Sequence, residues 1–134
     1  MTTPIIIGGE GYRWRGRSIR TIRVSNAMCV TMPRKDSMIM VPCSIQAGVQ
    51  YKISVFASKN SGNGAMLINF FGGKNYDGET ISLNVLTGDM REYIIAVSAP
   101  GTPKNMPVYF RAWRPDDATG NVVIRMISIT AIGG

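Results

Sequence analysis

The chain has 134 residues, enough for a single domain with a sizeable hydrophobic core. It contains no histidine, which removes Ser-His-Asp and Cys-His nucleophilic sites and most catalytic zinc sites. The net charge of +7 is unevenly placed, because residues 1–35 hold seven Lys or Arg against Glu10 alone and so carry +6 of it. A localised positive surface favours an acidic partner.

The N-terminal residues show neither a strand period nor a helix period, which predicts an extended arm of residues 1–16 in front of one domain of residues 17–134. Within this arm, the apolar tripeptide of residues 5–7 is followed by two glycines. Such a segment can add as a strand to the sheet of a neighbouring molecule. It can equally form an edge strand of its own domain, and both interpretations stay open.

From residue 17 onward, short apolar or alternating runs are separated by turn sequences rich in Gly, Pro, Asn and Asp. The clearest run, residues 49–57, places Tyr51, Ile53 and Val55 on one face and is typical of a half-buried strand. No stretch shows a helical stripe. The pattern predicts an all-β fold, an antiparallel jelly-roll β-sandwich of eight or nine strands. The expected strands are residues 19–24, 26–32, 37–41, 49–57, 65–71, 81–85, 90–98, 108–114 and 121–131.

Several sequence elements carry a family resemblance. An x-Ala-Gly-x-x-Tyr-x-x-Ser-x-x-Ala element spans residues 46–57, an Ala-Met-Cys-Val strand precedes it at 27–30, and a Gly-x-Val-x-Ile strand closes the chain at 120–124. Together with Glu92-Tyr93, this order resembles the jelly-roll carbohydrate-binding modules of the family 4/9/16/22 type over residues 25–132. The resemblance implies a jelly roll and glycan binding. Arg125 stands where these modules often carry Asp, so the resemblance implies no calcium site.

The acidic residues give little indication of a catalytic or metal site. The chain has eight Asp and Glu residues, and turn formation explains most of them. The protein is therefore expected not to be an enzyme and to use no cofactor or metal. Cys29 and Cys43 are compatible with one disulfide or with two thiols. The absence of a secretion signal favours thiols.

The least ordinary stretch is residues 12–23, where five arginines interleave with Tyr12 and Trp14. Arginine forks pair with carboxylates and phosphates, and Tyr, Trp and Arg are frequent interface anchors. The nearly neutral remainder of the chain favours an acidic protein surface over nucleic acid as the partner. A solvated strand face is the alternative. The predicted partner-binding residues are Ile5, Ile6, Ile7, Tyr12, Arg13, Trp14, Arg15, Arg17, Arg20 and Arg23.

A second candidate surface is aromatic. The alternation of residues 108–114 places Tyr109, Arg111 and Trp113 on one strand face, where sugar rings can stack beside a polar group. Phe56, Phe71 and Tyr76 are further candidates for such a platform. A core or interface role is the alternative for these side chains.

These observations lead to two hypotheses about function. The first is a non-enzymatic structural protein that decorates or cements a phage capsid, because small jelly rolls with protruding arms serve there and the basic arm suits an acidic major capsid protein. This hypothesis places the protein on the virion after synthesis in the host cytoplasm, as a homo-oligomer. The second hypothesis is a carbohydrate-binding module. No signal peptide or membrane-spanning segment is expected.

Overall fold

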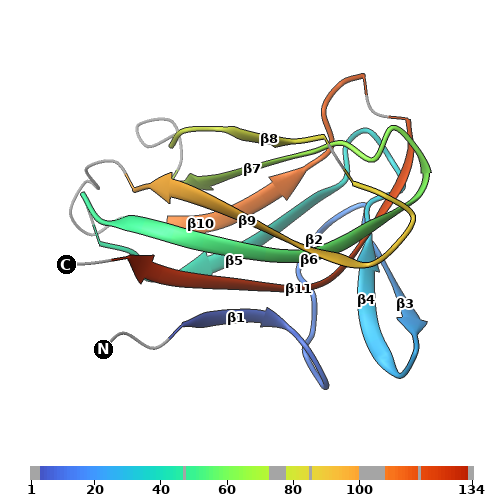
Figure 1. Ribbon diagram of the computed structural model, residues 1–134, viewed down its shortest axis with the longest axis horizontal. Coiled ribbons are helices and arrows are strands. Elements are labelled where there is room, and N and C mark those ends of the chain that lie inside the picture. Colours follow the sequence, from blue (N-terminus) through green and yellow to red (C-terminus); the bar gives the residue numbers. More distant parts are fainter. Residues whose placement is uncertain are drawn as a thin grey trace.

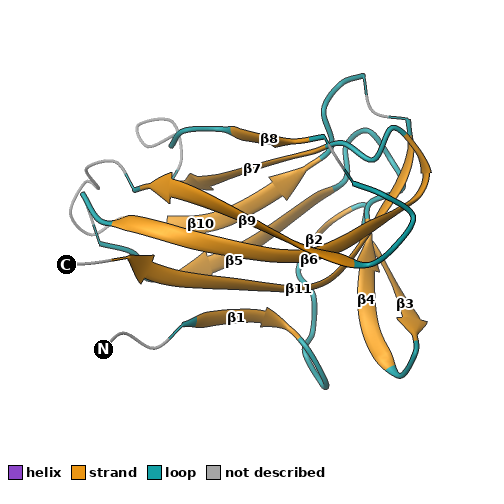
Figure 2. Cartoon of the chain, in the orientation of Figure 1, coloured by secondary structure: helices purple, strands orange, loops and turns teal. Residues whose placement is uncertain are grey.

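The computed structural model describes residues 4–46, 48–72, 78–84, 86–99, 108–117 and 119–132, and these form a sandwich of two antiparallel sheets (Figures 1 and 2). All-β architecture and antiparallel pairing are therefore confirmed. One sheet has six strands in the order β3-β4-β11-β6-β9, with β1 also paired to β11. Its strands are β1 (Ile5–Gly8), β3 (Arg20–Val24), β4 (Ala27–Thr31), β6 (Gln50–Gly62), β9 (Arg91–Ser98) and β11 (Gly120–Ile132).

The other sheet has five strands in the order β2-β5-β10-β7-β8 and lies face to face with the first (Figure 1). Every pairing in both sheets is antiparallel, and the crossovers between the layers produce the jelly-roll connectivity. The β3–β4 hairpin projects from one end of the sandwich. The strands of this second sheet are β2 (Gly16–Arg17), β5 (Met38–Cys43), β7 (Met66–Phe71), β8 (Ile81–Leu83) and β10 (Val108–Trp113).

The core fills the space between the two sheets with side chains that follow the two-residue strand period. On β6 the residues predicted to face inward, Tyr51, Ile53 and Val55, are buried. They meet the inner face of β7 and β10, where Tyr51 packs edge-on against Phe70 with ring centroids 5.6 Å apart. The Tyr51 hydroxyl accepts a hydrogen bond from the Gln46 backbone N–H at 2.8 Å, which anchors the turn before the strand.

Two strands differ from the sequence prediction at their ends. β6 continues to Gly62, through residues expected to form a loop, because it stays paired with the equally long β11. β5 continues through Pro42, which was expected to stop it. Proline lacks a backbone N–H and cannot donate a hydrogen bond to a neighbouring strand. On one side Pro42 lies opposite Tyr109 of β10. On the other side β2 pairs only with Met38 and Ile39, so no strand there needs a donor from residue 42.

A β-bulge in β11 changes which side chains share a face. An uninterrupted two-residue period along the expected strand 121–131 would set Ile124 and Met126 on one face, but the pairing register shifts between them. Ile124 lies opposite Ala57 and is buried, whereas Met126 lies opposite Phe56 on the outer face. The extra residue at the shift is Arg125, which is exposed, because a bulge inserts one residue that has no ladder partner of its own.

The N-terminal segment does not extend away from the sandwich as the arm prediction stated. β1 pairs antiparallel with β11, with Ile5 opposite Ile129 and Ile7 opposite Ile127. Ile7 is only 1% exposed and belongs to the core. Of the two interpretations of this tripeptide, the edge strand of its own domain is the one observed, since pairing with β11 buries apolar surface that a free arm would expose.

The two cysteines are free thiols and lie in different sheets, Cys29 on β4 and Cys43 on β5. Burial raises the pKa of the Cys43 thiol to about 11, and a hydrogen bond with the Phe110 backbone opposes part of this effect. Burial also raises the pKa of Cys29, while the positive charge of Arg125 lowers it. Both thiols are therefore protonated and weakly nucleophilic at neutral pH.

Cys43 should make folding stability sensitive to alkaline pH. In the unfolded chain the thiol ionises near pH 9, whereas in the folded protein it ionises near pH 11, so the folded state holds the proton more tightly. Its contribution is complete below pH 9 and is lost as pH rises toward 11, by about 3 kcal/mol in total. Urea unfolding measured from pH 8 to 11 should show this loss in the natural protein. Cys43→Ala should lack that component, and identical pH slopes would contradict the assignment.

Candidate functional site

The outer face of the five-stranded sheet gathers the aromatic residues predicted on β10. Burial along β10 alternates strictly, so Val108, Phe110 and Ala112 face the core. The intervening Tyr109, Arg111 and Trp113 are half-buried and point outward. The sheet thus places all three predicted glycan-binding candidates on one surface. This surface, together with Asn69 and Phe71 of β7, is called the outer aromatic face below.

Antiparallel pairing with β7 supplies the neighbours of these side chains. Phe71 lies directly opposite Tyr109, and Asn69 lies directly opposite Arg111. The Arg111 guanidinium carbon lies 4.0 Å from the Phe71 ring centroid and 4.3 Å from the Trp113 ring centroid, within cation–π range. Arg111 Nε donates a hydrogen bond of 3.1 Å to Asn69 Oδ1. Stacking and hydrogen bonding together hold the arginine and both rings in a fixed arrangement.

Asn69 is the member of this face that the sequence interpretation did not identify. Its side chain is fully buried, although it lies on the outer side of β7 between Leu67 and Phe71. A buried amide needs hydrogen-bond partners, and Arg111 is one of them. The period of β7, which sets Leu67, Asn69 and Phe71 on one side, is the feature that could have indicated it.

Two further aromatic candidates do not join the outer aromatic face. Phe56 lies on β6 in the six-stranded sheet, opposite Met126, so it belongs to the other layer. Phe56 therefore cannot share a platform with Trp113. The alternation of a strand shows which of its residues share a face, but not that β6 and β10 belong to different sheets. Tyr76 lies outside the described residues.

The predicted partner-binding segment is distributed over the core and several surfaces. Trp14 is only 7% exposed and packs in the core, and Tyr12 contacts it edge-on with ring centroids 5.2 Å apart. Burial raises the pKa of the Tyr12 hydroxyl, and the nearby Arg15 opposes this effect. Neither Ile7 nor Trp14 offers a surface to a partner, so both are corrected from anchors to core residues.

The arginines of this segment stay exposed but point in different directions. Arg15 and Arg17 lie beside β5, where the Arg15 carbonyl accepts the Met40 N–H and Arg17 Nε donates to the Asp36 carbonyl at 3.2 Å. Arg20 and Arg23 lie on opposite faces of β3 because they are three residues apart. The five arginines therefore do not form one basic stripe. The free arm was the main support for the capsid-decoration hypothesis, and that support is now lost.

Among the described residues, no three Cys, Asp or Glu side chains come together as a cation site would require. No helix capable of crossing a membrane occurs in the described ranges.

A scan against models of protein families finds no match, and no curated protein matches the sequence. Solved structures do match. The C-terminal family 6 carbohydrate-binding module of a laminarinase from Zobellia galactanivorans has a TM-score of 0.68 and 15% identity, covering 96% of this chain and 99% of that one. The family 6 module of Cellvibrio mixtus lichenase 5A, solved with cellotriose, has a TM-score of 0.69 and 14% identity, covering 96% and 98%.

A third similar structure is a family 36 carbohydrate-binding module in complex with calcium and xylotriose, with a TM-score of 0.62 and 14% identity, covering 96% of this chain and all of that one. Modules of families 4 and 22 also match, at TM-scores of 0.61 and 0.66. The resemblance stated from the sequence is therefore confirmed at the level of fold. This chain has the jelly-roll fold of carbohydrate-binding modules.

Proposed function

We propose that this protein is a non-catalytic glycan-binding domain that holds a neutral oligosaccharide on its outer aromatic face. The observation that carries the proposal is the arrangement of Trp113, Tyr109 and Phe71 around the Arg111–Asn69 pair. A sugar ring has an apolar C–H face and a polar hydroxyl rim. Partly exposed rings beside the Arg111 guanidinium match both parts of that surface, and the buried Asn69 amide holds the guanidinium in place.

The fold neighbours support the same function class. Two of the similar modules were solved with cellotriose and xylotriose, which are linear chains of three sugars. A sheet face accommodates such a chain without a deep pocket, because successive sugars contact successive strands. Arg111 covers one face of the Phe71 and Trp113 rings, so the ligand contacts the remaining ring surface and the polar groups between them.

The experiment that tests the proposal compares removal of a ring from the outer aromatic face with removal of an exposed aliphatic side chain from the other sheet. Trp113→Ala is expected to weaken binding of a neutral oligosaccharide at least tenfold, or about 1.4 kcal/mol, because the largest ring of the face is lost. Glycan-array screening identifies the ligand, and calorimetry or affinity-gel electrophoresis measures the affinity.

The matched control is Ile94→Ala, which removes an exposed apolar side chain from β9 in the opposite sheet. This variant should bind like the natural protein. A natural protein that binds no glycan on the array, or a Trp113→Ala variant with full affinity, would exclude the outer aromatic face as a glycan site.

A further inference from the structure

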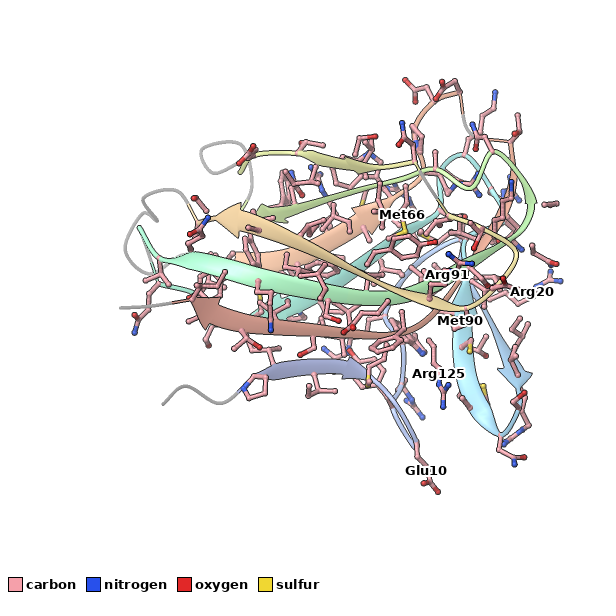
Figure 3. All side chains as sticks on the ribbon, viewed as in Figure 1. Glu10, Arg20, Met66, Met90, Arg91 and Arg125 are labelled. Atoms are coloured by element: carbon pink, nitrogen blue, oxygen red, sulfur yellow. The ribbon has the colours of Figure 1, made fainter. Side chains whose placement is uncertain are left out.

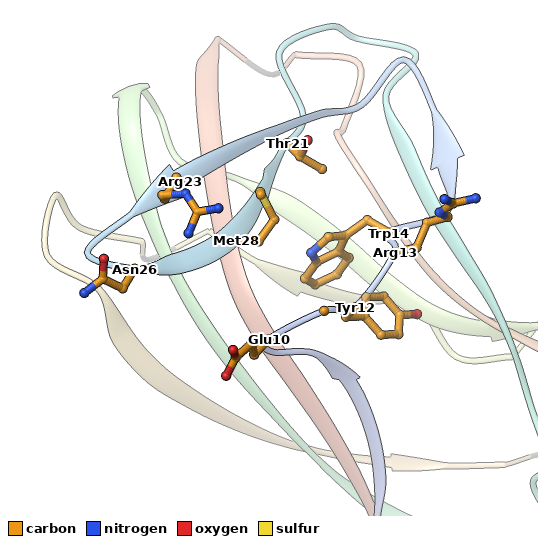
Figure 4. A pocket seen from close by; sticks show the side chains of 9 residues that line it. Glu10, Tyr12, Arg13, Trp14, Thr21, Arg23, Asn26 and Met28 are labelled. Carbon is orange, nitrogen blue, oxygen red and sulfur yellow. The ribbon is translucent and has the colours of Figure 1, made fainter.

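A separate pocket lies at the end of the sandwich, between the segment that links β1 to β2 and the β3–β4 hairpin (Figure 4). Its volume is about 490 Å³, within the range that small-molecule sites occupy. It shares no residue with the outer aromatic face. The residues used below are Glu10, Tyr12, Trp14, Thr21, Arg23 and Asn26, all of which line it.

The floor of this pocket contains a hydrogen-bond donor that the protein leaves unused. Trp14 is more than nine-tenths buried, and its indole Nε1–H has no hydrogen-bond partner in the part of the chain that the structure describes. Figure 4 shows the indole nitrogen on the ring edge that faces Met28 and the hairpin, which is the pocket side. Buried donors in native proteins are almost always paired. An unpaired one on a pocket floor indicates an acceptor that comes from outside the chain.

The charge around the pocket indicates that this acceptor is anionic. Figure 4 shows the Arg23 guanidinium turned toward Met28 over the pocket. An adjoining pocket of about 460 Å³ shares Glu10 and Asn26 and is bounded by Arg125, the bulge residue of β11 (Figure 3). Neither Arg23 nor Arg125 takes part in an ion pair within the described residues. Among the described residues, Glu10 is the only acidic one that lines either pocket, so the positive charge is in excess.

The remaining lining suits a ligand with hydroxyl groups. Thr21 offers a hydroxyl, Asn26 an amide and Glu10 a carboxylate, while the partly buried Tyr12 ring stands edge-on against Trp14. We infer that this pocket binds the carboxylate of an acidic sugar unit, a hexuronate. Arg23 pairs with the carboxylate, and Trp14 Nε1–H donates to a ligand oxygen once the flexible Met28 side chain beside it moves aside. An aspartate or glutamate side chain of a protein partner presents the same carboxylate without the hydroxyl groups that Thr21 and Asn26 match.

Tryptophan fluorescence provides a direct test, because the chain has only two tryptophans. In the full-length Trp113→Phe variant, Trp14 is the only indole left and reports on its own pocket. Titration with D-glucuronate is expected to change its emission in a saturable way. D-glucose, acetate and N-acetylglutamate at matched ionic strength are expected to leave the emission unchanged.

Two arginines of β3 provide the matched pair of variants. Arg23→Gln should weaken glucuronate binding at least tenfold, since it removes the pocket cation. Arg20→Gln removes an equal charge from the opposite face of the same strand and should bind normally. The inference is overturned if glucuronate gives no saturable change, if acetate or N-acetylglutamate binds as well, or if both variants weaken binding equally. Binding of glucuronate without any neutral glycan would retain this site and exclude the outer aromatic face.

Discussion

Replacing Gly62 with alanine is expected to lower the free energy of unfolding by about 4 kcal/mol. Gly62 ends β6 directly opposite Gly120, which begins β11, and the two residues have φ angles of 74° and 72°. A Cβ at residue 62 would lie 1.9 Å from the Thr119 carbonyl oxygen and 2.6 Å from the Gly120 nitrogen. These are backbone atoms of a paired strand and cannot move aside, and alanine at this φ is strained as well.

Urea unfolding of Gly62→Ala measures the expected loss. Gly88→Ala is the control, because an added Cβ there has no heavy atom within 4 Å. Since no atom of the described residues lies in the way, the control should be neutral or slightly more stable, by up to about 1 kcal/mol, because alanine restricts the unfolded chain. Equal stabilities of the two variants would contradict the close approach of β6 and β11 at this corner.

Replacing Arg114 with methionine is expected to cost about 3 kcal/mol and to lower the melting temperature by about 10 °C. Arg114 is only 2% exposed and donates to three carbonyl oxygens, those of Met32 at 3.0 Å, Gly120 at 2.9 Å and Thr119 at 2.8 Å. Burial lowers the pKa of this guanidinium. Methionine fills similar space but donates no hydrogen bond, so these acceptors lose their partner.

Calorimetry of Arg114→Met and Arg91→Met separates this effect from simple loss of charge. Arg91 is exposed, with only a 3.5 Å contact to Asp89, and its replacement should change stability by less than about 0.5 kcal/mol. Arg114→Lys should lie between the natural protein and the methionine variant, because lysine keeps a donor but not the planar fork. A methionine variant as stable as Arg91→Met would show that the three hydrogen bonds contribute nothing.

Both predictions concern the corner of the sandwich where Gly62, Arg114 and Gly120 meet, and the sequence did not indicate that these residues come together. Arg114 is the last residue of the expected strand 108–114 and precedes a Pro-Asp-Asp turn, a context in which an arginine is normally solvated. Its acceptors come from the end of β4 and the start of β11. No local pattern indicates that these carbonyls meet one guanidinium. The same holds for Asn63, which bonds Thr119 across the corner from 56 residues away.

The candidate sites were predictable to unequal degrees. Alternation on β10 correctly placed Tyr109, Arg111 and Trp113 on one face, because neighbouring side chains of a strand point to opposite sides. The stacking of Arg111 on Phe71 required the pairing of β10 with β7. The composition of residues 12–23 indicated a binding segment. It did not indicate that the side chains of this segment divide between the core, the pocket and the surface.

The residue pattern was enough to predict the all-β class, the inward face of β6 and the shared face of Tyr109, Arg111 and Trp113 on β10, because each depends on a two-residue period within one strand. The three-dimensional structure was needed to show that β1 pairs with β11, that Arg125 forms a bulge and that Trp14 Nε1 is buried with no partner among the described residues. The first joins strands more than a hundred residues apart, and the second depends on the register between β6 and β11. A local pattern shows which side of a strand is apolar, but not which strand will cover it.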